Sequence, residues 1–152
     1  MAHELVRHGD DDAAITNYRE AIRLDPKSSE ARLELGMVYF NSMDLKLQAE
    51  AAAEFQAALV LNSKDEKAQL MLGEDAARKG DSKAAYDAES RAVQLNPDDP
   101  DACTELAKTL IDMGEMDKAR SLLDHAISLD PTNETAHYRL ARSHGCALQS
   151  HA

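Results

Sequence analysis

Residues 80–97, GDSKAAYDAESRAVQLNP, decide the fold, because two further stretches of the chain repeat their pattern. Residues 9–26 read GDDDAAITNYREAIRLDP and residues 114–131 read GEMDKARSLLDHAISLDP. Each copy begins with glycine and an acid, has alanine at its sixth and thirteenth positions, and ends in Leu-Asp-Pro or Leu-Asn-Pro. Such self-similarity indicates a protein built from structural repeats, each of which packs against its neighbours.

The period of the repeat is close to 34 residues. Pro97 and Pro131 are 34 residues apart, and Pro26 and Pro97 are 71 apart, which is 34 + 37. A weaker copy fills the longer gap, and its three extra residues fall in the polar stretch 41–48, where we expect a longer turn. This copy is marked by Ala51, Phe55, Ala58, Leu61, Asn62 and Ser63.

Each copy is expected to contain the second helix of a helix pair. Apolar residues recur at three- and four-residue steps, as in Tyr18, Ala21 and Ile22. A preceding pair such as Gly9-Asp10 is expected to end one helix and start the next, since glycine accepts a left-handed conformation and aspartate caps free amides. The closing proline ends the second helix, because it cannot donate to the helical ladder.

First helices carry a small residue at one repeated position, which would let the two helices of a pair approach closely. The position follows a leucine and is occupied by Gly36, Gly73, Ala107 and Ala141. A larger side chain there, at Gly73 for example, is expected to force the helices apart at a cost of about 1–3 kcal/mol.

The chain resembles the tetratricopeptide repeat family in its period, its Leu-Gly…Tyr and Ala…Tyr/Phe…Ala patterns and its closing proline. The resemblance implies an all-α, right-handed solenoid of stacked antiparallel helix pairs. We expect one domain, 1–152, with a partial repeat 1–28, repeats 29–65, 66–99 and 100–133, and a terminal helix 134–148. The partial first copy suggests a piece of a larger protein.

Composition excludes several classes of function. The formal charge of −11 disfavours nucleic acid, whose phosphates would meet a protein of their own sign. No apolar run suits a membrane helix and no segment resembles a signal peptide, so membrane insertion is not expected and the cytoplasm is the default location. Phosphate loops, zinc patterns and nucleophile elbows are missing, which predicts a non-enzyme without cofactors.

Family geometry implies a concave groove, lined by first helices, that binds a peptide or helical segment of a partner protein. The resemblance assigns to this groove Leu33, Glu34, Met37, Phe40, Asn41, Leu70, Met71, Glu74, Arg78, Lys108, Ile111, Arg139 and Arg142. Its apolar floor is formed by Leu33, Met37, Phe40, Leu70 and Met71, and its basic end by Lys108, Arg139 and Arg142. Such a groove suits a partner with apolar anchors at one end and an acid at the other. Leu33 and Leu70 can equally pack between neighbouring first helices.

Several alternatives stay open. The partial first copy leaves Ile15, Tyr18 and Ile22 without a complete partner helix, so the chain can also be a structural segment that forms homodimers through exposed terminal repeat faces. His137 and His144 share one helical face near Cys146 and His151, but water-exposed histidines on a terminal helix explain them better than a metal. Cys103 fits a small, partly buried thiol.

Overall fold

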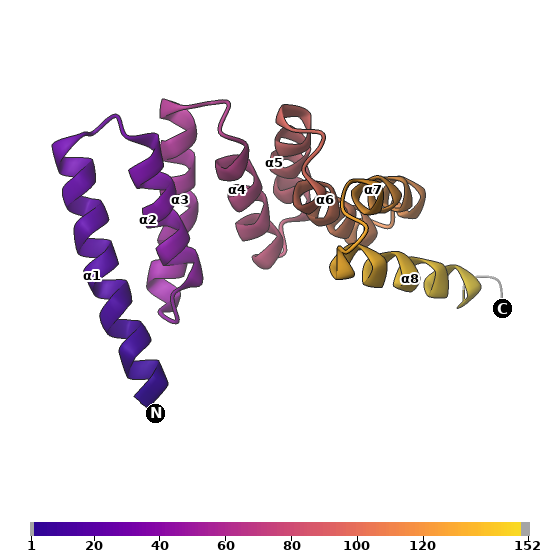
Figure 1. The fold of residues 1–152 in the computed structure, drawn as a ribbon, viewed down its shortest axis with the longest axis horizontal. Coiled ribbons are helices and arrows are strands. Elements are labelled where there is room, and N and C mark those ends of the chain that lie inside the picture. Colours follow the sequence, from indigo (N-terminus) through magenta and orange to yellow (C-terminus); the bar gives the residue numbers. More distant parts are fainter. Residues whose placement is uncertain (1, 150–152) are drawn as a thin grey trace. The chain divides into compact units, whose positions relative to one another are not determined.

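The computed structural model describes the backbone of residues 2–149 and the side chains of residues 11–144. Within residues 2–149 the chain is helical and contains no strand, so the all-α prediction is confirmed. The helices, labelled in Figure 1, are α1 (Ala2–Leu24), α2 (Ser29–Asn41), α3 (Leu45–Leu61), α4 (Glu66–Arg78), α5 (Ser82–Leu95), α6 (Pro100–Asp112), α7 (Met116–Leu129) and α8 (Glu134–Gln149).

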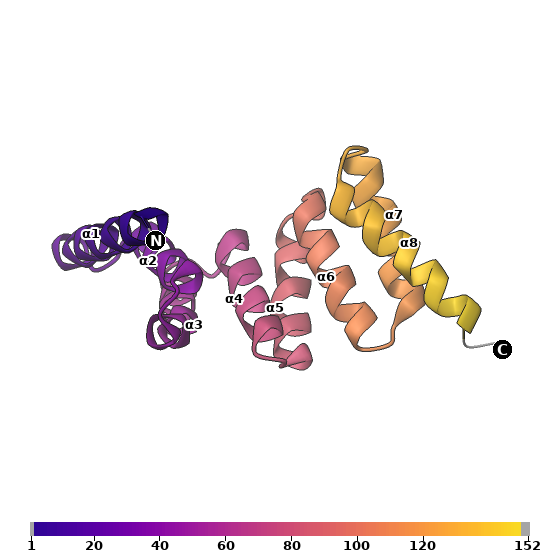
Figure 2. The ribbon, with the colours of Figure 1, turned by 90° about the horizontal axis from the view of Figure 1, so that it is seen from below.

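The chain divides into two compact units, Met1–Asp75 and Ala76–Ala152. In the first unit, α2 packs against both α1 and α3 (Figure 1). In the second, α6 packs against α5, α7 and α8, and α7 also contacts α8 (Figure 2). Antiparallel neighbours joined by short turns are therefore the building principle inside each unit.

Short polar side chains begin most of the helices. Asp81 precedes α5, and its Oδ1 accepts a hydrogen bond from the Ala84 amide at 3.0 Å. A side-chain oxygen at this place satisfies an amide that has no partner within the helix. The same role falls to Ser28, Asp44, Asp65, Asp99 and Asn133.

The turns inside the later helix pairs use glycine as the sequence predicts. Gly80 and Gly114 have φ angles of 81° and 82°, a left-handed conformation that side chains with a Cβ rarely adopt. The expected cap is confirmed at Asp81, whereas Glu115 makes no capping hydrogen bond with its side chain. Glycine is therefore the feature that the two turns share.

The helix break predicted at Gly9-Asp10 is wrong, because α1 continues through both residues from Ala2 to Leu24. A turn at Gly9 would interrupt the backbone hydrogen bonds that the continuous helix keeps. Glycine inside a helix costs only about 1 kcal/mol relative to alanine, so continuing the helix is the smaller penalty.

The core of the first unit is centred on the contact between α2 and α3. Phe55 is fully buried, and its ring lies 6.3 Å from that of Phe40 between centroids. Gly36 faces the same ring, since a Cβ built on it would lie 2.7 Å from Cε1 of Phe55. The absence of a side chain at Gly36 therefore allows α2 and α3 to pack this closely, as the pattern of small residues predicts.

The apolar edge that the sequence predicts on α1 is largely covered. Ile15 is only 7% exposed, and Tyr18 and Ile22 pack against the core of the first unit. Arg19 adds a polar link to α2, since its Nη2 donates a 2.8 Å hydrogen bond to the Tyr39 hydroxyl. The expected uncovered edge is therefore absent at Ile15, which is buried, whereas Tyr18 and Ile22 are only partly covered.

The core of the second unit combines alanines with a few larger residues. Ala107, Ala119 and Ala126 are all fully buried, beside Leu123. Cys103 belongs to this core, and its Sγ lies 3.7 Å from the Pro97 carbonyl oxygen, to which it can donate a hydrogen bond. The thiol is therefore a core group, and it is more deeply buried than the sequence predicts.

Burial also raises the pKa of the Cys103 thiol, and the charges of Asp99 and Asp98 raise it further. The reactive thiolate is therefore scarcer than in an exposed cysteine at the same pH. In a Cys146→Ser protein at pH 8, we expect Cys103 to react with iodoacetamide at least about tenfold more slowly than in the urea-unfolded chain. Equal rates in the two states, measured by mass spectrometry, would contradict its burial.

Candidate functional site

A cavity of about 200 Å³ lies in the second unit, where α6, the start of α7 and α8 meet. Four of the residues that the sequence assigns to the groove line it, namely Lys108 and Ile111 of α6 and Arg139 and Arg142 of α8. The remaining lining residues are Asp112, Met116 and Ser143. Because this is where predicted groove residues surround a cavity, we take it as the candidate site and call it the α6–α8 pocket.

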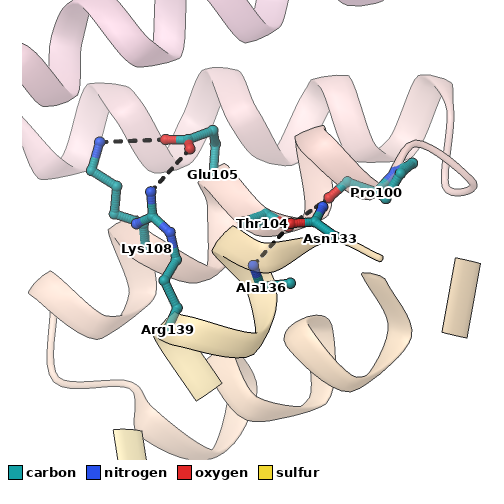
Figure 3. A network of polar contacts seen from close by, with 7 residues as sticks. All are labelled: Pro100, Thr104, Glu105, Lys108, Asn133, Ala136 and Arg139. Carbon is teal, nitrogen blue, oxygen red and sulfur yellow. Dashed lines mark hydrogen bonds and ion pairs between the residues drawn. The ribbon is translucent and has the colours of Figure 1, made fainter. Parts of the chain in front are cut away.

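Local hydrogen bonds fix the two helices that carry the pocket (Figure 3). On α6, the Thr104 hydroxyl donates to the Pro100 carbonyl at 2.7 Å. On α8, Asn133 Oδ1 accepts from the Ala136 amide at 2.9 Å and so caps the helix. Residues one to two turns further along α6 and α8 are thereby held at the pocket.

Glu105 links two of the pocket's cations (Figure 3). Its Oε2 accepts a hydrogen bond from Lys108 Nζ at 3.3 Å, and its Oε1 accepts one from Arg139 Nη2 at 3.1 Å. The second pair joins α6 to α8 across 34 positions of sequence, one repeat period. Glu105 thus orients both cations, although it does not line the pocket itself.

The pocket is positively charged and partly apolar. It is lined by three cations but by the single carboxylate of Asp112, while Ile111 and Met116 supply apolar surface. Among the residues whose side chains are described, Arg142 makes no ion pair, and its guanidinium lies 5.8 Å from the centre of the Tyr138 ring. Tyr138 is itself 63% exposed. A carboxylate beside an aliphatic group matches this surface in charge and polarity.

The groove residues assigned to the first unit have different surroundings. Leu33 and Phe40 belong to the core, with 5% and 8% of their surface exposed, so they offer little area to a partner. Met37 and Met71 are half-buried and pack against the same core. Glu34 and Asn41 remain accessible, and Glu34 Oε1 lies 3.6 Å from Lys67 Nζ.

Three other assigned residues lie along α4. Leu70 and Glu74 are half-buried, and Arg78 at the end of α4 is exposed. None of them lines the α6–α8 pocket. Their role in binding a partner stays a prediction.

Besides Asp112 of α6, two lining residues are not among those assigned from the sequence. Met116 begins α7, a second helix, whereas the family pattern directs attention to first helices. Ser143 is 2% exposed and is held by Arg120, whose Nη2 donates to the Ser143 carbonyl oxygen at 2.8 Å. Neither residue carries a sequence signal, since each reaches the pocket only through the packing of α8 on α6 and α7.

Among the described residues, no group of three or more histidine, cysteine, aspartate or glutamate side chains is placed to hold a metal ion. His137 instead places its Nε2 3.1 Å from the Pro131 carbonyl oxygen, and His144 is exposed. The side chain of Cys146 and residue His151 lie outside the described residues. Within 2–149, none of the helices has both the length and the apolar character needed to cross a membrane.

Comparison with known families agrees with this architecture. Models of the tetratricopeptide repeat match residues 76–143 and 48–100, and a TPR repeat model matches residues 2–42. The chain belongs to the tetratricopeptide repeat family. Its fold is accordingly that of an all-α TPR solenoid.

Two solved TPR structures illustrate the likeness. A crystal structure of MamA is 31% identical, with a TM-score of 0.80 over 94% of this chain and 82% of that one. A structure of YrrB, described as a TPR protein with an unusual peptide-binding site, is 25% identical, with a TM-score of 0.75 over 96% of this chain and 74% of that one.

A curated relative is considerably longer. BBSome complex member BBS4 of Bos taurus is 31% identical over 99% of this chain, which spans only 28% of that protein. A DnaJ homolog subfamily C member 7 homolog of Schizosaccharomyces pombe is 28% identical over 85% of the chain, and the match covers 30% of its length. The chain thus spans less than a third of the curated relatives to which it is similar.

Proposed function

We propose that the chain is a non-enzymatic protein-interaction module that binds a peptide or helical segment of a partner protein. The observation that carries the proposal is the α6–α8 pocket, where four residues assigned to the groove from sequence surround one cavity. Membership of the TPR family supports the general role, because repeat folds of this kind present extended binding surfaces. The YrrB structure, described as having a peptide-binding site, is consistent with it.

The chemistry of the pocket defines the partner segment that suits it. Lys108, Arg139 and Arg142 favour a carboxylate, and Ile111 and Met116 favour an apolar side chain beside that carboxylate. A protein partner suits this surface better than nucleic acid, because the chain carries a net charge of −11. The cytoplasmic location, the single-domain organisation and the repeat boundaries stay predictions.

Site-specific photo-crosslinking tests the proposal. A benzoylphenylalanine in place of Tyr138, which is 63% exposed beside Arg142, should trap a partner on irradiation of a cell extract. The same probe in place of Ser121, exposed on α7, serves as the matched control in the same unit. We expect a crosslinked band of defined mass from the Tyr138 position only. Identical crosslinks from both positions, or none from either, would contradict binding at this surface.

Self-association is the second candidate function. Leu24 at the end of α1 is 70% exposed and Tyr138 on α8 is 63% exposed, so the first and last described helices both present a large apolar side chain to solvent. Exposed groups of this kind favour contact between copies of the chain. Light scattering at rising concentration tests this alternative, and a mass that stays at 16.7 kDa would remove it.

A further inference from the structure

We propose that Glu105 is a resident counter-ion of the α6–α8 pocket, which a partner's carboxylate displaces, so that Glu105 limits the affinity for acidic partner segments. The inference rests on the proposed function and concerns the regulation of the same site.

Glu105 already occupies hydrogen-bond donors of the α6–α8 pocket. Its two carboxylate oxygens accept from Lys108 Nζ at 3.3 Å and from Arg139 Nη2 at 3.1 Å (Figure 3). Both cations line the cavity, whereas Glu105 is not among its lining residues. An anion that enters the cavity therefore meets Lys108 and Arg139 while they are bound to Glu105.

The α6–α8 pocket has more hydrogen-bond donors than acceptors. Arg139 Nε is buried and has no hydrogen-bond acceptor, so the guanidinium is only partly satisfied by Glu105. Arg142 forms no ion pair among the described side chains, and neither does Asp112, the carboxylate that lines the pocket. The exposed and unpaired guanidinium of Arg142 favours the uptake of one more carboxylate.

A partner carboxylate is expected to replace Glu105 at these cations, because binding beside it would place two negative charges together. Two carboxylates that share the same cations repel each other, so an incoming acid and Glu105 compete for Lys108 and Arg139. The side chains of Lys108, Arg139 and Glu105 are 39%, 20% and 21% exposed. The ion pair with Lys108 has the most access to water, so it is weak and is the first to break. Glu105 therefore holds the cations in place until a partner carboxylate replaces it.

The test is an NMR titration of the full chain with two small probes, N-acetyl-Leu-Glu-amide and the uncharged N-acetyl-Leu-Gln-amide. We expect the wild-type chain to bind the Glu probe, with shifts of the amides of Lys108, Ile111, Arg139 and Arg142. Glu105→Gln should bind the Glu probe about fivefold more tightly, since it loses the competing charge and keeps an oxygen that can accept from Arg139. Affinity for the Gln probe should stay unchanged.

Asp112→Asn is the matched control. It removes one negative charge from the pocket wall without breaking an ion pair, so its effect measures net charge alone. An effect of Glu105→Gln clearly larger than that of Asp112→Asn supports displacement. Equal effects, or weaker binding by Glu105→Gln, would overturn it.

A second measurement uses the wild-type chain and so does not depend on the folding of a variant. The ¹³C resonance of the Glu105 carboxylate should shift in parallel with saturation by the Glu probe. A carboxylate resonance that stays constant at saturation rejects displacement, and failure of the Glu probe to bind rejects it too. Photo-crosslinking from position 138 tests the proposed function independently of Glu105. A partner trapped there would support partner binding even if the titration shows that Glu105 does not compete with the probe.

Discussion

Replacing Gly36 with leucine is expected to lower the free energy of unfolding by about 3 kcal/mol, near the upper end of the cost of overpacking a core. The cause is the contact between α2 and α3, where a Cβ at position 36 would lie 2.7 Å and 2.8 Å from two ring carbons of Phe55. Phe55 is fully buried, so its ring cannot turn toward solvent to make room. The helices must separate, or α2 must shift along α3.

Gly36→Ala should give a smaller loss, because two effects oppose each other. Alanine has a higher helix propensity than glycine by about 1 kcal/mol, whereas its methyl group would still collide with Phe55. We expect a net loss of about 1 kcal/mol, since relief of overpacking commonly requires a shift of the backbone. The free energy of unfolding should therefore fall from the wild type to Gly36→Ala and again to Gly36→Leu.

Urea unfolding followed by circular dichroism measures both changes. Ala53→Leu is the control, because Ala53 is exposed on α3 and the added side chain meets no packed neighbour; its effect should stay within about 0.5 kcal/mol. A Gly36→Leu variant as stable as the wild type would show that α2 and α3 do not need a glycine at their contact.

Short sequence patterns predicted the helix pairs well, because the turns and caps that bound the helices have local physical causes. The left-handed conformation at Gly80 and Gly114 and the cap at Asp81 depend on a few neighbouring residues. The break at Gly9 failed for the converse reason. A glycine permits a turn but does not impose one, and whether the chain bends there depends on the packing of the segment on either side.

The candidate site was predictable only in part. Family geometry identified Lys108, Arg139 and Arg142, but it also assigned Leu33 and Phe40, which the packing of the first unit buries. Side chains on one helical face share a direction, and burial depends on how closely the next helix approaches. That distance is a tertiary property, which the pattern of one helix does not contain.

The link between Glu105 and Arg139 had a signal that the sequence reading did not use. The two residues are 34 positions apart, so they occupy the same place in successive repeats. Glu34 and Lys67 form a similar pair 3.6 Å apart between α2 and α4. Aligning the repeats and searching for an acid followed by a base at the equivalent position would have found the pair of Glu105 and Arg139. It would not have found the pair of Glu34 and Lys67, because the residue equivalent to Glu34 is Met71.

Arg142→Glu is expected to weaken binding of the N-acetyl-Leu-Glu-amide probe at least about tenfold, which is about 1.4 kcal/mol. Arg142 lines the α6–α8 pocket and, among the described side chains, forms no ion pair, so its charge is available to a ligand. Reversal of that charge removes the attraction between position 142 and the carboxylate of the probe, and it replaces that attraction with a repulsion. The pocket wall already carries the negative charge of Asp112. The residue is exposed, so the fold should tolerate the change.

Arg91→Glu provides the matched control, since it makes the same change of charge at an exposed position of α5 that does not line the pocket. The same titration should give an affinity within about twofold of the wild type for this variant, because an exposed charge distant from the ligand is screened by salt. Equal losses in the two variants would mean that the probe responds to the net charge of the chain. A loss confined to Arg142→Glu would instead locate the acid of the partner at α8, where the cations of two successive first helices converge on one cavity.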